Sequence, residues 1–344
     1  MAKTALITGI SGQDGGYLTK SLLARGYRVI GAQRRSAGMN SARLEELGVL
    51  DDIELVDVEM LEDSNIRSVL RKLKPEEIYN LAAQSFVALS FEQPIYTCEV
   101  DAISVLRLLE AVKESCPDAR FYQASTSEMF GKVQAIPQSE TTPFYPRSPY
   151  GIAKVFAHWI TVNYREAYGL FSCLGILFNH ESPLRGMEFV TRKVTLGLAR
   201  VALGKQETVY LGNLEAKRDW GFAGDYVEGM WMMLQQEKPD DFVLATGRTV
   251  TVRSFVDGAA AALGFDLEWE GDGAATRGID RRSGKTVVAV SPEFYRPAEV
   301  NMLIGDPTKA KRVLGWEAET SLEELIQMMA KSDFDRVKSG SLRF

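Results

Sequence analysis

The first half of the chain alternates short apolar runs with amphipathic stretches of helical length, and this alternation limits the fold more than any other feature. The apolar runs predict strands at residues 4–8, 28–32, 53–56, 77–81, 120–124 and 172–177. The stretches between them predict helices at residues 16–25, 64–72, 100–115 and 150–168. Strands that alternate with helices are typical of βαβ units, so we expect an α/β fold with a doubly wound parallel sheet.

A glycine-rich turn joins the first predicted strand to the first predicted helix. Its spacing is G-x-x-G-x-x-G, which differs from the G-x-G-x-x-G of many dehydrogenases. Glycines at such a turn let the backbone bend sharply and approach a pyrophosphate, and the helix N-terminus supplies N–H groups to the phosphates. The turn predicts a Rossmann-type dinucleotide site that contains Gly9, Gly12, Gln13, Asp14 and Gly15.

The end of the second predicted strand indicates which dinucleotide binds. An NAD site carries Asp or Glu there to hold the ribose hydroxyls, whereas this chain has Arg34 and Arg35. A guanidinium pairs with phosphate through two parallel hydrogen bonds, which suits the 2′-phosphate of NADP. An exposed basic turn is the alternative explanation. We expect NADP as the cofactor.

The second half of the chain has a different rhythm. Loops that contain Gly, Pro and Arg separate predicted helices at residues 191–203, 225–235, 252–263 and 322–331, and residues 271–285 predict an exposed loop. A chain of 344 residues is long enough for two closely joined domains. We expect an NADP-binding Rossmann domain at residues 1–178. A smaller, mixed α/β domain at residues 179–335 should mainly bind substrate, with chain crossing between the two.

A Tyr-x-x-x-Lys pair and a polar strand end supply groups for hydride chemistry. Tyr150 and Lys154 lie one turn apart on the same face of a predicted helix. The pKa of a tyrosine is ordinarily about 10, and a neighbouring ammonium should lower it. Thr126 and Glu128 follow the fifth predicted strand, at the edge where doubly wound sheets bind ligands. The pair alone is common by chance, but its combination with the glycine turn predicts a catalytic site.

These motifs resemble the extended short-chain dehydrogenase/reductase family. Within that family, residues 121–128, 143–150 and 176–183 are similar to the enzymes that remove water from GDP-mannose. The likeness continues through residues 189–193, 218–221 and 295–299, and so spans nearly the whole chain. The resemblance implies a lyase that takes GDP-mannose as substrate and NADP as a cofactor that is not consumed.

The resemblance also implies catalytic roles for Thr126, Glu128, Tyr150 and Lys154. Tyr150 takes the proton of the C4 hydroxyl while NADP takes the C4 hydride, and Thr126 bonds to the C4 oxygen. Glu128 then removes the C5 proton, water leaves from C6, and the hydride returns to C6. The alternatives are a surface carboxylate for Glu128 and ordinary backbone capping for Thr126 and Ser85.

Binding residues follow from the same matched motifs. The cofactor set adds Glu59, Ser85, Lys154, His180 and Arg185. The substrate set comprises Ser85, Asn179, Val190, Lys193, Arg218, Arg296 and Glu299. Surface ion pairs are the alternative for the two arginines of the substrate set. Glu59 departs from the family pattern, which has Asp beside the adenine, and Asp57 is the other candidate for that contact.

Composition argues against several other classes of protein. A formal net charge of -6 argues against a nucleic-acid partner, because binding to phosphates needs a basic face. The two histidines and three cysteines show no metal-ligand spacing, and the odd number of cysteines fits reduced thiols. No segment is long enough to span a bilayer, and no leader peptide is visible. We expect a cytoplasmic protein and, by the resemblance, a homotetramer or homodimer.

Other functions stay open at this point. A GDP-manno-heptose 4,6-dehydratase, a GDP-sugar C4-reductase or a GDP-sugar epimerase would share many of these motifs. A non-catalytic, NADP-sensing protein on the same fold is a more distant alternative. Such proteins tend to lose the tyrosine or the lysine, and this chain keeps both Tyr150 and Lys154.

Overall fold

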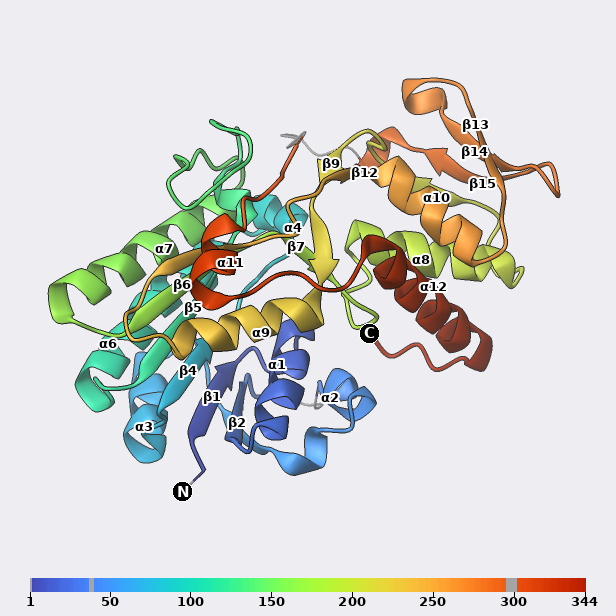
Figure 1. Cartoon of the computed structure of the whole chain (residues 1–344). Coiled ribbons are helices and arrows are strands. Elements are labelled where there is room, and N and C mark those ends of the chain that lie inside the picture. Colours follow the sequence, from blue (N-terminus) through green and yellow to red (C-terminus); the bar gives the residue numbers. More distant parts are fainter. Residues whose placement is uncertain (1, 37–39, 295–301) are drawn as a thin grey trace.

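A seven-stranded parallel sheet forms the centre of the larger lobe in the computed structural model, which describes residues 2–36, 40–294 and 302–344 (Figure 1). The strand order is β11-β6-β5-β4-β1-β2-β3, so the order reverses between β1 and β4. This confirms the predicted doubly wound fold, and all six predicted strands are present. The strands are β1 (Thr4–Thr8), β2 (Arg28–Gln33), β3 (Glu54–Asp57), β4 (Glu77–Asn80), β5 (Arg120–Thr126), β6 (Ser172–Leu177) and β11 (Asp241–Leu244).

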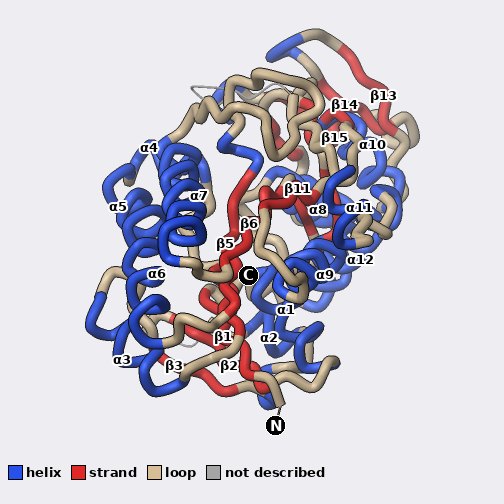
Figure 2. Tube along the Cα trace, turned by 60° about the vertical axis from the view of Figure 1, so that its left-hand side comes forward, coloured by secondary structure: helices blue, strands red, loops and turns tan. Residues whose placement is uncertain are grey.

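Helices cover both faces of this sheet, as Figure 2 shows. Ala5 and Ile7 of β1 pack into one core cluster, whereas Leu6 between them packs into the cluster on the opposite face. Burial on both faces explains why the strands read as continuous apolar runs. One layer consists of α3 (Asp63–Leu73), α6 (Ser104–Ser115) and α7 (Pro149–Tyr168), and the other of α1 (Gln13–Ala24), α9 (Ala223–Leu234) and α11 (Thr308–Leu314).

The chain leaves the larger lobe after β6 and later returns to it. The returning segment contributes α9, which packs against α1, and β11, which pairs in parallel with β6. Two short strand pairs lie on the paths between the lobes: β7 (Asn179–Glu181) with β10 (Trp220–Phe222), and β9 (Lys217–Arg218) with β12 (Val250–Thr251). The division into residues 1–178 and 179–335 stays a prediction.

The smaller lobe combines a mixed four-stranded sheet with three helices (Figure 1). The sheet has the order β13-β14-β15-β8, in which only β15 and β8 are parallel. Against it lie α8, α10 and α12, which also pack against one another. The elements are α8 (Val190–Ala202), β8 (Val209–Leu211), α10 (Val252–Ala262), β13 (Leu267–Glu270), β14 (Arg277–Asp280), β15 (Lys285–Val290) and α12 (Leu322–Ser339).

The prediction of an exposed loop at residues 271–285 holds for residues 271–275 and 281–284, which are exposed and outside strands, but is wrong for residues 277–280. β14 lies inside this segment and pairs with both β13 and β15. Gly278 is buried beneath the ring of Trp269 on β13. A Cβ at this position would lie 3.1 Å from that ring, so the close packing of the two strands needs a glycine. Asp280 is also buried, and its carboxylate replaces its hydration by accepting hydrogen bonds from the N–H groups of Asp266 and Ser283. Gly and Asp therefore shape a sheet here rather than a solvated loop.

A buried ion pair joins α8 to α12. The side chains of Arg192 and Asp333 have no exposed surface, and Arg192 Nε lies 2.7 Å from Asp333 Oδ1. Asp333→Ala would leave the guanidinium in the core without its counter-charge, so we expect the free energy of unfolding to fall by about 3–5 kcal/mol. Urea unfolding measures this loss, with the exposed Asp335→Ala on the same helix as control. Equal stability of the two variants would contradict the prediction.

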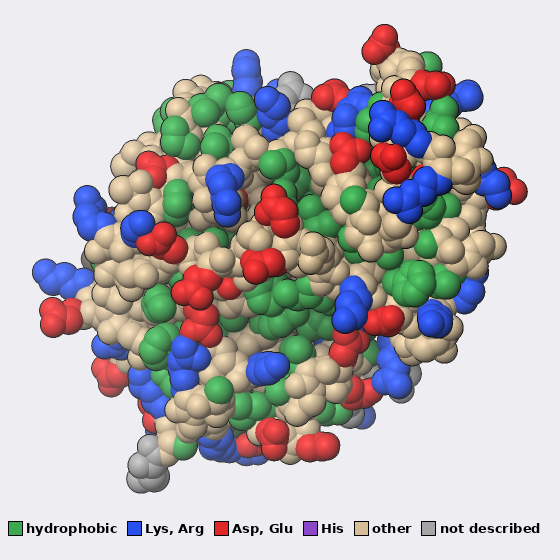
Figure 3. All heavy atoms as spheres, turned by 45° about the vertical axis from the view of Figure 1, so that its right-hand side comes forward, with side chains coloured by type: hydrophobic (Ala, Val, Ile, Leu, Met, Phe, Trp, Pro, Cys, Tyr) green, Lys and Arg blue, Asp and Glu red, His purple; other side chains and the backbone are tan. Residues whose placement is uncertain are grey.

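Charges of both signs are interspersed on the surface. On the face drawn in Figure 3, Lys and Arg side chains alternate with Asp and Glu side chains, so the face lacks a strong field of one sign. Within residues 2–36, 40–294 and 302–344, no helix is long and apolar enough to cross a membrane. Over the same ranges, no group of three or more His, Cys, Asp or Glu side chains is arranged to hold a metal ion.

Candidate functional site

A cavity of about 830 Å³ opens between the two lobes, at the carboxyl ends of the central strands. Its lining brings together most of the residues that the sequence predicts for the site. Arg34, Arg35 and Glu59 lie outside this lining, and Arg296 and Glu299 lie outside the described residues. The predicted residues that line the cavity are Gly9, Gly12, Gln13, Asp14, Gly15, Ser85, Thr126, Glu128, Tyr150, Lys154, Asn179, His180, Arg185, Val190, Lys193 and Arg218.

The glycine turn forms one end of the cavity. Gly9 has a positive φ of 68°, and a Cβ there would lie 2.8 Å from the backbone nitrogen of Ala82. A Cβ on Gly15 would lie 2.6 Å from backbone atoms of Ile10, so this glycine is needed for close packing of α1 on the turn. Because α1 begins at Gln13, its first turn lines the cavity. This shape fits a pyrophosphate at a helix N-terminus.

Hydrogen bonds tie the glycine turn to β7. Gln13 Nε2 donates to the backbone oxygen of His180 at 3.0 Å, and His180 Nε2 lies 2.8 Å from Asp14 Oδ2. The other ring nitrogen of His180 lies 2.7 Å from the backbone oxygen of Phe178. Burial lowers the pKa of His180, but the Asp14 carboxylate outweighs burial and raises the pKa above its ordinary value. Both ring nitrogens face oxygen acceptors, an arrangement that favours the protonated ring over the neutral one.

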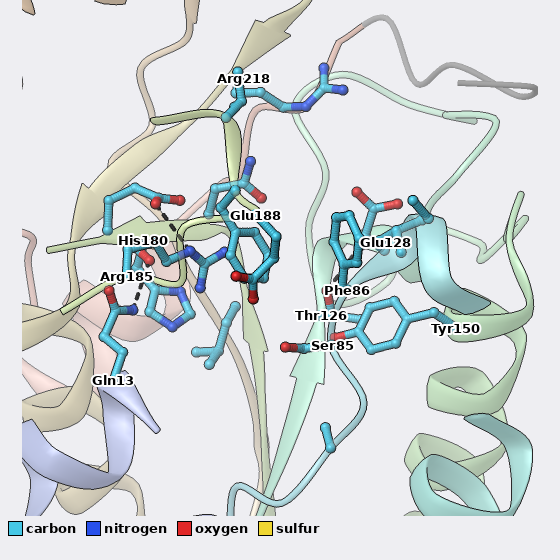
Figure 4. A pocket seen from close by; sticks show the side chains of 18 of the residues that line it. Gln13, Ser85, Phe86, Thr126, Glu128, Tyr150, His180, Arg185, Glu188 and Arg218 are labelled. Carbon is cyan, nitrogen blue, oxygen red and sulfur yellow. Dashed lines mark hydrogen bonds and ion pairs between the residues drawn. The ribbon is translucent and has the colours of Figure 1, made fainter. Parts of the chain in front are cut away.

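The opposite wall carries the predicted catalytic residues, as Figure 4 shows for Ser85, Thr126, Glu128 and Tyr150. Helix α7 begins with Pro149, and its N-cap Ser148 accepts a hydrogen bond from the backbone N–H of Gly151. This start fixes Tyr150 at the cavity and Lys154 one turn further on. Lys154 Nζ donates to the backbone oxygen of Ala124 at 3.1 Å, and Thr126 Oγ1 accepts from the N–H of Glu128 at 3.2 Å. The wall therefore holds a phenol, an ammonium, a hydroxyl and a carboxylate together.

Burial shifts the pKa values of Tyr150 and Lys154 in opposite directions. Burial, and then the carboxylate of Asp101, raise the pKa of Tyr150 above its ordinary value, although a hydrogen bond with Thr126 opposes this. Burial lowers the pKa of Lys154, and Asp101 opposes that change. The sequence predicts a lowered pKa for Tyr150, and this expectation is wrong for the structure. The reason is that loss of hydration and the Asp101 carboxylate outweigh the hydrogen bond with Thr126, while the Lys154 ammonium lies 5.8 Å from the ring centre.

An aromatic contact bridges the two lobes across the cavity, and sequence reasoning missed it. The rings of Phe86 and Phe189 lie 6.1 Å apart at 71°, and the guanidinium of Arg185 lies 3.6 Å from the centre of the Phe189 ring. Phe86 follows Ser85, and Phe189 precedes Val190. Their position next to predicted site residues was the one feature of the sequence that could have indicated that the two rings line the cavity. Glu188, also missed, lies on the same side of the cavity as Arg185 (Figure 4).

The far end of the cavity lies in the smaller lobe. Figure 4 shows Arg218 there, well separated from Tyr150. The ammonium of Lys193 lies 3.0 Å from the centre of the Phe294 ring, and Gly212 and Asn213 line the same cavity. Cations and backbone at one end, with acid and base groups at the other, suit an elongated anionic ligand.

The three predicted cofactor residues outside the lining lie past two neighbouring strands. Arg34 and Arg35 follow β2 and are exposed, and Arg34 Nη1 donates to Tyr96 OH at 3.4 Å. Glu59 follows β3, where its Oε1 accepts from the backbone N–H of Leu61 at 3.2 Å. β2 and β3 pair in parallel next to β1, so all three residues lie at the same edge of the sheet as the glycine turn.

Comparison with known proteins assigns the chain to a family. The family model described as GDP-mannose 4,6 dehydratase matches residues 6–329. A GDP-mannose 4,6-dehydratase of Sinorhizobium fredii (strain HH103) is 53% identical over an alignment of 343 positions, which covers 98% of each chain. The GDP-mannose 4,6 dehydratase of Homo sapiens is 49% identical over an alignment of 345 positions, which covers 98% of this chain and 92% of the other.

Similarity to a solved structure agrees with this assignment at the level of the fold. UDP-glucose 4-epimerase of Thermotoga maritima, solved with UDP-glucose, is 25% identical with a TM-score of 0.81. The match covers 98% of this chain and 99% of the epimerase. Because the family model matches most of the chain and two relatives are about half identical over nearly its whole length, the chain belongs to the GDP-mannose 4,6-dehydratase family.

Proposed function

We propose that the protein converts GDP-mannose to GDP-4-keto-6-deoxymannose and water, with hydride transfer from C4 to C6 through bound NADP. The observation that carries this proposal is the wall that holds Thr126, Glu128, Tyr150 and Lys154 opposite the glycine turn, in one cavity. The membership in the GDP-mannose 4,6-dehydratase family supports the same substrate and reaction. The protein is then a hydro-lyase.

The side chains on this wall match the demands of the reaction. NADP supplies the acceptor and later the donor of the hydride. Tyr150 accepts the proton of the C4 hydroxyl, and Thr126 donates a hydrogen bond to the oxygen that becomes a ketone. The ketone makes the C5 hydrogen acidic, because the developing charge spreads onto the carbonyl oxygen. Glu128, half-buried just past β5, then removes this proton, and the C6 hydroxyl leaves as water when Glu128 or a neighbouring acid protonates it. The hydride then returns to C6, and Tyr150 or water gives a proton to C5.

The remaining predicted residues take binding roles in this proposal. The first turn of α1, with Gly12, Gln13 and Asp14, would hold the pyrophosphate of the cofactor, and Lys154 would hold its ribose. His180 and Arg185 lie on the cofactor side of the cavity, and Glu59 remains the candidate for the adenine. The substrate would contact Ser85, Asn179, Val190, Lys193, Arg218, Arg296 and Glu299.

We infer NADP rather than NAD from Arg34 and Arg35, which are exposed past the end of β2. Replacement of both by Ala should weaken NADP binding by about 10- to 100-fold and change NAD binding little, because charge-assisted hydrogen bonds contribute about 1.5–3 kcal/mol. Titration of the purified variant with each cofactor measures this change. Arg71→Ala, an exposed arginine of α3, is the control. Equal losses for NADP and NAD would argue against a 2′-phosphate site.

The proposed reaction is tested by incubation of the protein with GDP-mannose and no added reductant. Mass analysis should find a product lighter by one water, and a carbonyl reagent should trap its ketone. A C4-reductase would need a stoichiometric reductant, and an epimerase would give a product of unchanged mass. A parallel incubation with GDP-manno-heptose compares the two sugars. Recovery of unchanged GDP-mannose would refute the proposal.

Assembly and location are further parts of the proposal. We infer a homodimer or homotetramer, because α7 exposes Ile152 and Trp159, and the neighbouring α5 (Pro94–Cys98) exposes 80% of Ile95. Light scattering on the purified protein measures its mass. Cys98, Cys116 and Cys173 form no disulfide, which supports a cytoplasmic location.

A further inference from the structure

A buried carboxylate lies behind the catalytic wall and has no place in the reaction described so far. Asp101 is 1% exposed and belongs to the π-helical turn Glu99–Ile103, which packs against α7. Its Oδ1 accepts a hydrogen bond from the backbone N–H of Gln84 at 2.7 Å. Its Oδ2 is buried and has no hydrogen-bond partner among the described residues. A buried polar atom left unpaired costs about 1–3 kcal/mol, and both such atoms and π-helical turns are frequent at functional sites.

The charged group that acts on Asp101 from the packed elements is Lys154 of α7. Burial raises the pKa of Asp101 to about 6, and Lys154 opposes the rise. Lys154 is itself 3% exposed, and burial lowers its pKa while Asp101 opposes that change. Asp101 also acts on Tyr150, the other titratable group of α7 at this place. A buried ammonium and a buried carboxylate each stabilise the charged form of the other.

We propose that Asp101 is a positioning residue, the buried counter-charge that keeps Lys154 an ammonium beside Tyr150. The inference deepens the proposed function, since Tyr150 and Lys154 act in that reaction. The π-helical turn that carries this carboxylate packs against α7, and the bond from Gln84 fixes the carboxylate to the loop that lines the cavity between β4 and α4 (Val87–Glu92). Asp101 does not line the cavity, so it would act through Lys154 rather than on the substrate.

Asp101 interacts with both Lys154 and Tyr150, so loss of its charge should lower the pKa of each. Asp101→Asn keeps the shape and an acceptor for Gln84 but removes the charge. Lys154, without its counter-charge, should lose its proton at lower pH, so the basic limb of the kcat profile moves down. Tyr150, without a like-charged neighbour to its phenolate, should also ionise at lower pH, so the acid limb moves down. A carboxylate that only supports the fold would lower kcat without moving either limb.

The pH dependence of turnover on GDP-mannose tests the inference. In Asp101→Asn we expect both limbs to move down by about one pH unit, which is about a tenfold loss on the basic limb, with KM little changed. Asp101→Glu should restore most of the profile. Glu99→Gln is the matched control, because Glu99 lies on the same turn but is 43% exposed and pairs with Arg107. An unmoved profile in Asp101→Asn would overturn the inference.

A second measurement does not depend on turnover and so separates the two proposals. Amine labelling at a series of pH values, followed by mass analysis of the peptide that carries Lys154, gives the titration of Lys154 in the protein itself. This titration should move to lower pH in Asp101→Asn, and its failure to move would also count against Asp101. If the wild-type protein left GDP-mannose unchanged, the proposed function would fail and this titration alone would decide the role of Asp101. Asp101→Ser replaces Asp101→Asn if the asparagine variant does not fold.

Discussion

Glu128→Gln should stop the loss of water while leaving oxidation at C4 intact. An amide cannot accept the C5 proton, so we expect kcat to fall by about 10²- to 10⁴-fold, the range for loss of a general base. Tyr150, Thr126 and Lys154 remain on the same wall, so the first half of the reaction should proceed. Rapid mixing with GDP-mannose should therefore show one equivalent of reduced nicotinamide by absorbance, and this signal should decay slowly.

Exchange with solvent gives a direct measure of the same step. In deuterated water the wild-type protein should place deuterium at C5, and Glu128→Gln should place almost none. Glu166→Gln, an exposed carboxylate of α7, is the control and should behave as the wild type. Wild-type turnover by Glu128→Gln would show that this carboxylate takes no part in the reaction. If Glu128→Gln did not reduce the cofactor, the carboxylate would be needed already for the oxidation at C4.

Tyr150→Phe should abolish the reaction at its first step. The variant keeps the ring that packs in the wall but lacks the group that accepts the C4 proton. We expect kcat to fall by about 10³-fold or more, because both the proton transfer and a hydrogen bond to the reacting oxygen are lost. Unlike Glu128→Gln, this variant should produce no reduced nicotinamide on mixing with GDP-mannose.

Binding measurements separate chemistry from damage to the site. Affinity for GDP-mannose should change by less than about tenfold in Tyr150→Phe, because one hydrogen bond contributes a net of about 0.5–1.5 kcal/mol. Tyr168→Phe is the control, since Tyr168 lies on the same helix and is 54% exposed. Accumulation of reduced nicotinamide in Tyr150→Phe would assign the proton transfer to another group.

The sequence predicts the larger lobe well because its signals are local. Each predicted apolar run, of four to six residues, is a strand, and the glycines at Gly9 and Gly15 occur where the backbone admits no Cβ. The hairpin around β14 was missed because its glycines and aspartates also suit a loop. The segment forms a strand because it pairs with β13, where Trp269 covers Gly278. Such a pairing depends on two segments at once, so neither segment predicts it alone.

The site was predicted as a set of residues, but its electrostatics were not. The spacing of Tyr150 and Lys154 predicts that they share a helix face, which the structure confirms. It says nothing of burial, and burial reverses the expected change in the pKa of Tyr150. Phe86, which lines the cavity, and Asp101, which lies behind its wall, were missed because only the packing of the folded chain brings their segments there.

The return of the chain to β11 limits how the protein can be re-engineered. A cut after β6 would remove the strand that covers one edge of the large sheet and the helix α9 that packs on α1. The fragment would carry an open, apolar edge and should aggregate. A graft that aims to change the sugar or nucleotide must therefore replace three separate segments, one between β6 and α9, one between β11 and α11 and one after α11, and leave α9, β11 and α11 with the recipient.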